Sequence, residues 1–281
     1  MDENIEEIKR RIEAMHVKQL EMFKWLHEFC TENNIRYYAI AGTLLGAVRH
    51  GGFIPWDDDV DVSMPRPDYE KFVAMMKGRT GRFVAETVAD GNKEFSHKFC
   101  RLYDTTTTVI YDEKRTTKRG LFLDIFPFDG IGNTEKESMK YYKKMKNKVH
   151  IMSAKSRAFR KGRKFYQNAA IIIAKILPYN WRKMLMKLNK KLAEKNYYEC
   201  EYVCNFFGVW REKEIMKREW LGEPKLYKFE DIEVWGPQDA DSCLKQLYGD
   251  YMTPPPEEKR YPKHDHLVLK MDLNKSYLDE D

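Results

Sequence analysis

The sequence lacks any apolar run near the roughly 20 residues that a membrane-spanning helix needs. Its longest candidate, AAIIIAKIL at residues 169–177, is interrupted by Lys175 and followed by Pro178. We therefore expect no membrane span, and we interpret this segment as a core helix, with a helix lying on the surface as the alternative. Internal repeats and low-complexity tracts are also missing, so neither a repeat array nor a biased, unfolded segment is indicated.

Cysteine is scarce, with five scattered residues, and the chain opens with the charged stretch MDENIEEIKRRIEAM instead of an apolar signal segment. An odd number of cysteines together with this opening predicts a reduced, cytoplasmic setting. Cys200 and Cys204 have a spacing that a zinc site could use. No His/Cys pair follows them at ligand spacing, so we expect buried thiols.

What is present predicts a globular protein, because 281 residues with 42% hydrophobic and 14% aromatic side chains can bury a substantial core in one large or two small domains. The net charge of +6 is divided unevenly. Residues 136–195 hold nineteen Lys or Arg against two Glu, a local charge of +17, and the rest carries −11. Such a segment indicates a solvated helical face, or a surface for anionic lipid headgroups or a polyanionic acceptor, with nucleic acid the weaker option.

The hydrophobic periodicity predicts four regions. Apolar residues spaced by three and four, with one gap at Gln19, predict an amphipathic helix within residues 1–34 that docks on its own domain or, alternatively, forms a homodimer. Residues 35–133 read as a catalytic core. Residues 134–270 form a basic, mainly helical portion that includes the helix NWRKMLMKLNKKLAEK, and residues 271–281 form a polar tail, which we expect to be disordered.

The core alternates strand patterns with one short helix, TLLGAVRH. The fold class is therefore α/β (α+β), a mixed sheet with flanking helices and a mainly helical C-terminal portion. The expected strands lie at residues 35–42, 59–64, 82–88, 97–104, 106–112 and 120–128.

The chemistry concentrates in AGTLLGAVRHGGFIPWDDDVDV, residues 41–62, which holds four acidic residues within five positions. Clustered carboxylates repel one another unless a cation lies between them. Side chains alternate along a strand, so Asp57, Asp59 and Asp61 are expected on one side and Asp58 on the other. Three hard oxygen ligands suit Mg²⁺ or Mn²⁺, so we interpret the cluster as a metal site that also binds a phosphorylated substrate.

The turn before the acidic residues has features of a phosphate-binding site. Gly42 has no Cβ to block close approach, and Thr43 is expected to begin a helix whose N–H groups and dipole favour an anion. Arg49 and His50 would add cationic or donor groups, unless they only bond to the loop.

A further acid lies in GLFLDIFPFDG, where Asp124 is surrounded by apolar residues. An unpaired carboxylate would be costly there. A metal shared with Asp59 and Asp61, or a hydrogen bond to a nearby Arg or backbone group, would compensate for it. Asp129 has the features of an ordinary turn residue.

These motifs carry a resemblance. The Gly-Thr turn, the short helix, the acids alternating with valines and the later isolated acid resemble the nucleotidyltransferase fold. The longer segment GTLLGAVRHGGFIPWDDDVDV, together with GLFLDIFPFDG and YGDYMTPPPEEKR, is similar to motifs of the LicD family, which is related to the fukutin-related proteins. The similarity covers residues 37–266.

The resemblance implies a phosphotransferase that moves phosphocholine from CDP-choline, or a related phospho-alditol such as ribitol phosphate, to a hydroxyl of a cell-surface glycan or its lipid-linked precursor, with release of CMP. Lipopolysaccharide or teichoic acid biosynthesis would be its setting. By the same resemblance Asp59 and Asp61 are the metal-binding pair, Asp57 a helper and Asp124 the third carboxylate.

Three further positions remain open. Either Lys98 or Arg101 resembles the family's basic phosphate-contacting position. Either His264 or His266 resembles the family's histidine near YGDYM. A choline head group would need an aromatic enclosure. We favour Trp56, with other aromatic residues conceivable: Tyr103, Phe126, Trp210 and Trp235.

Two other function classes are weighed against the phosphotransferase. A nucleotidyltransferase acting on a sugar phosphate or nucleic acid would use the same acids and release pyrophosphate. A catalytically silent nucleotide-binding module would not bind Mn²⁺.

Overall fold

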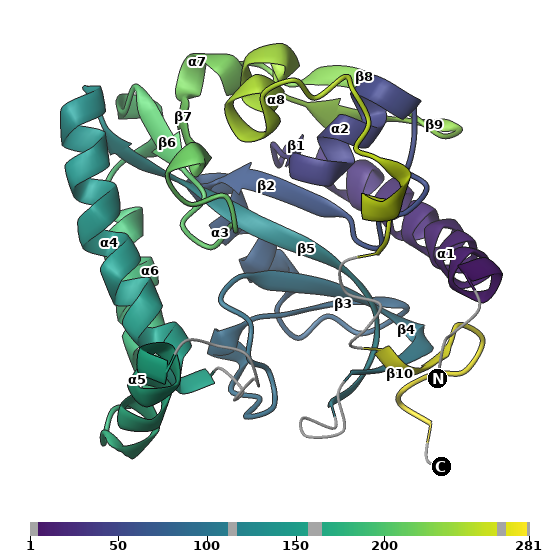
Figure 1. The fold of residues 1–281 in the computed structure, drawn as a ribbon, viewed down its shortest axis with the longest axis horizontal. Coiled ribbons are helices and arrows are strands. Elements are labelled where there is room, and N and C mark those ends of the chain that lie inside the picture. Colours follow the sequence, from purple (N-terminus) through teal and green to yellow (C-terminus); the bar gives the residue numbers. More distant parts are fainter. Residues whose placement is uncertain (1–4, 112–116, 157–164, 263–267, 280–281) are drawn as a thin grey trace.

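The computed structural model describes residues 5–111, 117–156, 165–262 and 268–279. Its centre is a curled, mixed sheet with helices on both sides and at one end (Figure 1), so the predicted fold class is confirmed. The helices are α1 (Ile5–Glu32), α2 (Ala41–His50), α3 (Arg66–Met76), α4 (Glu135–Ser156), α5 (Phe165–Ile176), α6 (Trp181–Ala193), α7 (Arg218–Leu221) and α8 (Ala240–Tyr248).

Strand β5 (Thr117–Gly132) organises the sheet. It pairs in parallel with β2 (Asp61–Pro65) and antiparallel with β4 (Cys100–Tyr111). Its residues from Leu121 to Ile131 are all buried, because helices or strands cover both of its faces. The remaining strands of this sheet are β1 (Tyr38–Ala39), β3 (Phe83–Glu86), β6 (Tyr202–Cys204), β7 (Ile215–Lys217) and β10 (Val268–Asp272).

Strand β4 joins two segments that the sequence separates. The strands expected at 97–104 and 106–112 are one strand, whose register with β5 shifts between Asp104 and Val109. The Asp104 carboxylate accepts hydrogen bonds from the backbone N–H and hydroxyl of Thr106, at 2.9 and 2.7 Å, and is ion-paired with Arg82. These local bonds stabilise a bulge where the sequence indicated a break.

Helix α1 packs on its own domain. Met15, Met22, Leu26 and Phe29 of its apolar stripe are buried in the main core, and the helix contacts β5 and the hairpin strand β9 (Ile232–Gly236). The structure therefore shows the first of the two alternatives for this helix, which is docking on its own domain. Burying that stripe removes apolar surface from water and holds α1 beside the start of β2.

The C-terminal portion contains helices α4 to α6, as expected, but it also supplies strands. β6 and β7 extend the central sheet, and β9 forms a hairpin with β8 (Lys225–Phe229). These strands have three to five residues within charged stretches, too few for an alternating pattern to stand out. Residues of the two halves therefore share one sheet.

The tail is ordered through Asp279, so the expectation of a disordered tail is wrong for these residues. β10 pairs antiparallel with β4, and the Tyr277 N–H donates to the Thr107 carbonyl at 3.1 Å. The exposed edge of β4 provides the unpaired backbone groups that this polar segment needs.

Helix α5 corrects another expectation. Ile171 and Ala174 are buried, but most of the other apolar side chains of AAIIIAKIL are exposed, so the surface alternative is right and the core interpretation is wrong. Within residues 5–111, 117–156, 165–262 and 268–279, no helix combines the length and apolar character that crossing a bilayer requires.

Candidate active site

Asp61 and Asp124 meet across the parallel pair β2 and β5. Their Cα atoms are register partners, and the Asp124 N–H donates to the Val60 carbonyl at 3.0 Å. Partners in neighbouring parallel strands project their side chains to the same side, with strands about 4.8 Å apart. Two acids that are 63 positions apart in the sequence are therefore neighbours.

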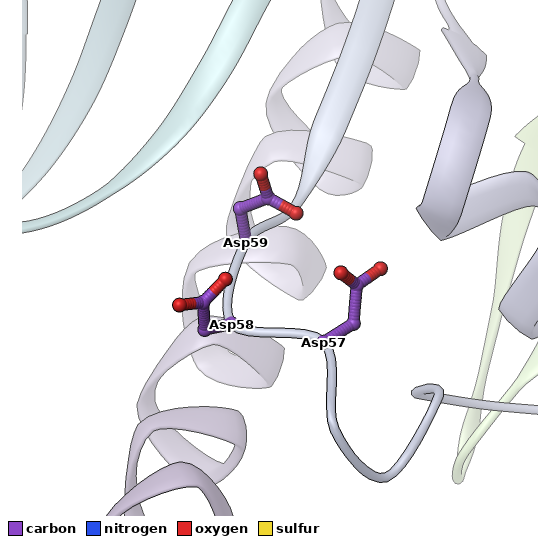
Figure 2. A group of neighbouring side chains, drawn as sticks. All are labelled: Asp57, Asp58 and Asp59. Carbon is purple, nitrogen blue, oxygen red and sulfur yellow. The ribbon is translucent and has the colours of Figure 1, made fainter. Parts of the chain in front are cut away.

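Three further carboxylates lie in the loop before β2. Oxygens of Asp57, Asp58 and Asp59 all lie within 4.8 Å of one another, and Figure 2 shows the three side chains on consecutive residues of this loop, with α1 behind it. The strand begins only at Asp61, so the alternation expected for residues 57–60 is wrong. Asp58, which alternation placed on the opposite side, therefore lies with Asp57 and Asp59.

Helix α1 fixes the backbone of this acid loop. The ring Nε2 of His16 lies 2.7 Å from the Asp57 carbonyl oxygen, and Gln19 Nε2 donates to the Asp58 carbonyl at 3.1 Å. Burial lowers the pKa of His16, so its neutral ring donates from Nε2 to that carbonyl. Gln19, the gap in the apolar stripe, is buried, and its Oε1 has no hydrogen-bond partner among the described residues.

Asp61 is tied to helix α2 and is surrounded by other acids. Its backbone N–H donates to the Thr43 hydroxyl at 2.8 Å, which ties β2 to helix α2. Burial, followed by the negative charges of Asp59, Asp124, Asp57 and Glu214, raises the pKa of Asp61 well above its ordinary value. The repulsion between these negative charges is the condition that a divalent cation would relieve.

Asp124 is also paired with a guanidinium. Arg101, its register partner on β4, donates from Nε to Oδ1 at 2.6 Å and from Nη2 to Oδ2 at 3.2 Å. The guanidinium carbon lies 3.6 Å from the centre of the Phe122 ring. Of the two ways in which the charge of Asp124 was expected to be compensated, the hydrogen bond to a nearby Arg is therefore present. It places the Arg101 guanidinium beside the group of acids. Lys98, the alternative basic position, is half-buried just before β4.

Helix α2 begins at Ala41, two residues before the predicted start at Thr43. Ala41 has φ 48°, a left-handed conformation that is disfavoured for alanine by about 1 kcal/mol and makes the turn from β1 into the helix sharp. A Cβ on Gly42 would lie 2.2 Å from Oδ2 of Asp57. Gly42 is therefore needed for close approach, but the group that approaches it here is the Asp57 carboxylate.

Arg49 and Trp56 each contact the C-terminal segment, and His50 lies against both of them. Arg49 Nη1 donates to the Tyr251 carbonyl at 2.6 Å, and burial lowers its pKa. The Arg260 guanidinium carbon lies 5.3 Å from the Trp56 ring centre, while the His50 ring meets Trp56 edge-on at 6.1 Å between ring centres. This cluster adjoins the acid loop through Trp56, which directly precedes Asp57.

Sequence reasoning missed Glu214 and gave Tyr248 no role. Glu214 is buried, it accepts the Trp210 N–H at 3.1 Å, and burial raises its pKa to about 7. Burial and the negative charges of Asp57 and Asp61 raise the pKa of Tyr248, whose ring packs edge-on against Trp210 at 4.8 Å. No local signal could have found Glu214, because the stretch REKE resembles a solvated turn.

Several other predicted positions lie elsewhere. Asp129 is wrongly described as a turn residue: it is fully buried in β5 and forms a bidentate ion pair with Arg66 at 2.6 and 2.8 Å. Cys200 and Cys204 are buried free thiols. Of the alternative aromatic residues, Tyr103 and Phe126 are buried in the cores and Trp235 packs against Tyr37 and His27. His264 and His266 lie outside the described residues.

Comparison with known proteins identifies the family. The model of "LicD/FKTN/FKRP, nucleotidyltransferase domain" matches residues 34–168. The chain is 32% identical over 250 residues to the lipopolysaccharide cholinephosphotransferase LicD of Haemophilus influenzae, an alignment that covers 87% of this chain and 92% of that protein. The chain belongs to the LicD family. The resemblance inferred from the motifs is therefore confirmed.

Other relatives match shorter stretches of the chain. The ribitol 5-phosphate transferases FKRP of mouse and human are each 33% identical over 94 residues, which is 34% of this chain and 17% of theirs. Two uncharacterized proteins, of Rickettsia prowazekii and Rickettsia typhi, are 52% identical over 48 residues, or 17% of this chain and 18% and 16% of theirs.

Proposed function

We propose that this chain transfers phosphocholine, or a related phospho-alditol, from a CDP-linked donor to a hydroxyl of a cell-surface glycan or its lipid-linked precursor, with release of CMP. The named relatives transfer phosphocholine or ribitol 5-phosphate, which supports the reaction class. The structural observation that carries the proposal is the alignment of Asp61 with Asp124 beside the acid loop, because it brings carboxylates from two strands to one place.

The residues fit a divalent cation. Oxygens within 4.8 Å of one another, and an Asp61 whose pKa is raised first by burial and then by like charges, are what a hard ion with oxygen ligands would require. Mg²⁺ or Mn²⁺ would be held by Asp57, Asp59, Asp61 and Asp124, with Asp58 within reach of the first two. When bound, the ion would offset the negative charge that collects on the departing CMP.

The protein side chains would position the reactants. The acceptor hydroxyl oxygen bonds to the phosphorus nearest choline while the bond from that phosphorus to the CMP oxygen breaks. We assign the hydroxyl proton to Asp124, with Arg101 holding that carboxylate in place. Gly42 and Thr43 would set the positions of Asp57 and Asp61. Arg49, His50, Lys98 and His266 stay predictions as donor-binding groups.

Trp56 stays our choice for the choline head group. Its indole ring directly precedes the acid loop, and Arg260 shows that a cation can lie over it. Trp56→Leu should raise the KM of a choline donor without a matching loss of kcat, and an unchanged KM would remove Trp56 from the pocket.

The description of the matching family model favours one alternative, a nucleotidyltransferase that acts on a sugar phosphate or nucleic acid. The two reactions differ in their product. A CDP-linked donor releases CMP, whereas a nucleoside triphosphate donor releases pyrophosphate.

The test is incubation of the purified protein with CDP-choline, CDP-ribitol or CTP, together with Mg²⁺ or Mn²⁺ and a glycan acceptor, with CMP and pyrophosphate separated by chromatography. Asp59→Asn and Asp61→Asn should lower the rate of CMP release by about a hundredfold to a thousandfold, a loss typical of removing electrostatic catalysis. Asp231→Asn, at an exposed loop, is the matched control and should retain full activity. Full activity of either site variant, or release of pyrophosphate, would overturn the proposal.

A homodimer through α1 remains the other partner prediction. The burial of the α1 stripe in its own domain leaves a smaller face for pairing. Sedimentation of the full chain would decide between monomer and dimer.

A further inference from the structure

The α5 surface consists of apolar side chains that face solvent. Exposed fractions are 45% for Ile172, 58% for Ile173, 77% for Ile176 and 48% for Leu177, and Ile151 on the neighbouring α4 is 55% exposed. Single exposed apolar residues are common, but five β-branched or leucine side chains on α4, on α5 and at the residue that follows α5 form a patch, because the two helices are in contact. We name these five residues the α5 surface.

The opposite side of α5 packs against the rest of the protein. Ile171 is 3% and Ala174 is 6% exposed, and α5 packs on α4. Just after α5, the Tyr179 hydroxyl donates to the Ile151 carbonyl at 2.9 Å. These contacts fix the helix with two of its residues buried and the α5 surface directed outward, so the described residues do not cover this patch.

The surroundings of the patch are basic. Lys175 lies among the exposed isoleucines, and Lys183 is exposed in the first turn of α6. On α4, Lys144 and Lys148 are exposed within two turns of Ile151. An occupant must therefore offer an apolar layer with negative charge at its border. A second copy does not fit, because a twofold contact would bring the same basic surfaces together.

The patch is also remote from the acid loop. In Figure 1, α5 lies at the lower left end of the layer formed by α4 and α6, whereas α1 and α2, which border the acid loop, lie on the right. A ligand on the α5 surface would thus leave the site accessible.

We propose that the α5 surface docks on a lipid bilayer that carries anionic headgroups, with the isoleucines entering the boundary between headgroups and acyl chains and the lysines contacting lipid phosphates. Helices with an apolar face and a cationic border bind membranes in this way. Each lysine near such a surface adds about fivefold to the affinity. The inference does not depend on the reaction that the acid site catalyses.

The test is flotation of the full-length protein with vesicles of phosphatidylcholine alone or with about one third phosphatidylglycerol. We expect binding to the anionic vesicles only, and weakening as salt rises from about 0.05 to 0.5 M. The double variant Ile173→Gln/Ile176→Gln should lower the affinity by at least tenfold, because apolar burial is lost. Lys175→Gln should lower it by about fivefold.

Leu226→Gln is the matched control: Leu226 is 53% exposed on the distant β8 and should not affect vesicle binding. Circular dichroism and thermal unfolding would show that the variants fold. No binding by the wild-type protein, or equal binding by Ile173→Gln/Ile176→Gln, would overturn the proposal. A wild-type dimer that this double variant dissociates, without vesicle binding, would overturn it in favour of a second copy.

Discussion

The ion pair between Arg101 and Asp124 is open to a quantitative test. Its two N–O distances are 2.6 and 3.2 Å, and its side chains are only 13% and 10% exposed. Arg101→Met keeps an aliphatic chain over the Phe122 ring but leaves the Asp124 carboxylate without its guanidinium. Asp124→Asn keeps the shape of the acid and removes its charge.

The expected magnitude follows from this burial. Removing one partner of a buried pair costs about 3–5 kcal/mol, and the residual exposure places Arg101→Met near 3 kcal/mol. In the double variant no charge remains uncompensated, so its loss should be smaller than the sum of the single losses by about 2 kcal/mol. Urea unfolding of all four proteins, with a chelator present at neutral pH, measures this coupling energy.

The exposed pair of Arg36 and Glu223 is the control. Arg36 Nη2 donates to both Glu223 oxygens, at 2.9 and 3.1 Å, but Glu223 is 79% exposed, so the coupling of this pair should stay below about 1 kcal/mol. Additive losses for Arg101 and Asp124 would refute the reasoning, because they would mean that the guanidinium does not compensate the carboxylate. A Mg²⁺ titration of Arg101→Met would then test whether a metal ion compensates the charge of the Asp124 carboxylate instead.

Three further predictions concern the supports of the site. Gly42→Ala should reduce kcat at least tenfold, with little loss of stability, because its Cβ would lie 2.2 Å from the Asp57 carboxylate while alanine suits the helix; unchanged steady-state kinetics would contradict this. Thr43→Val removes the acceptor of the Asp61 N–H and should lower the free energy of unfolding by about 1–2 kcal/mol in urea. Glu214→Gln should raise stability in a pH-dependent way. Burial raises the pKa of Glu214 from 4.5 to about 7, so the ionised carboxylate destabilises the folded state as pH rises through this interval. The gain should be absent below pH 4.5 and reach about 3 kcal/mol above pH 8, and a gain independent of pH would show another cause.

The sequence alone determined the elements that depend on local pattern. The spacing of Met22, Leu26 and Phe29 specified α1, and the apolar run around Asp124 specified β5, because side-chain periodicity follows from backbone geometry. The motif at residues 41–62 also indicated the acid cluster and the family, since both depend on residues close together in the chain.

Tertiary structure decided what those elements meet. The register that places Asp61 beside Asp124, the contact of Gln19 with the Asp58 carbonyl and the position of Glu214 near Asp61 all join distant segments. Such contacts depend on how helices and strands pack, and no local pattern encodes them. The same reason explains why the isoleucines of α5 could be recognised as helical but not as exposed: burial depends on which neighbouring helix covers them.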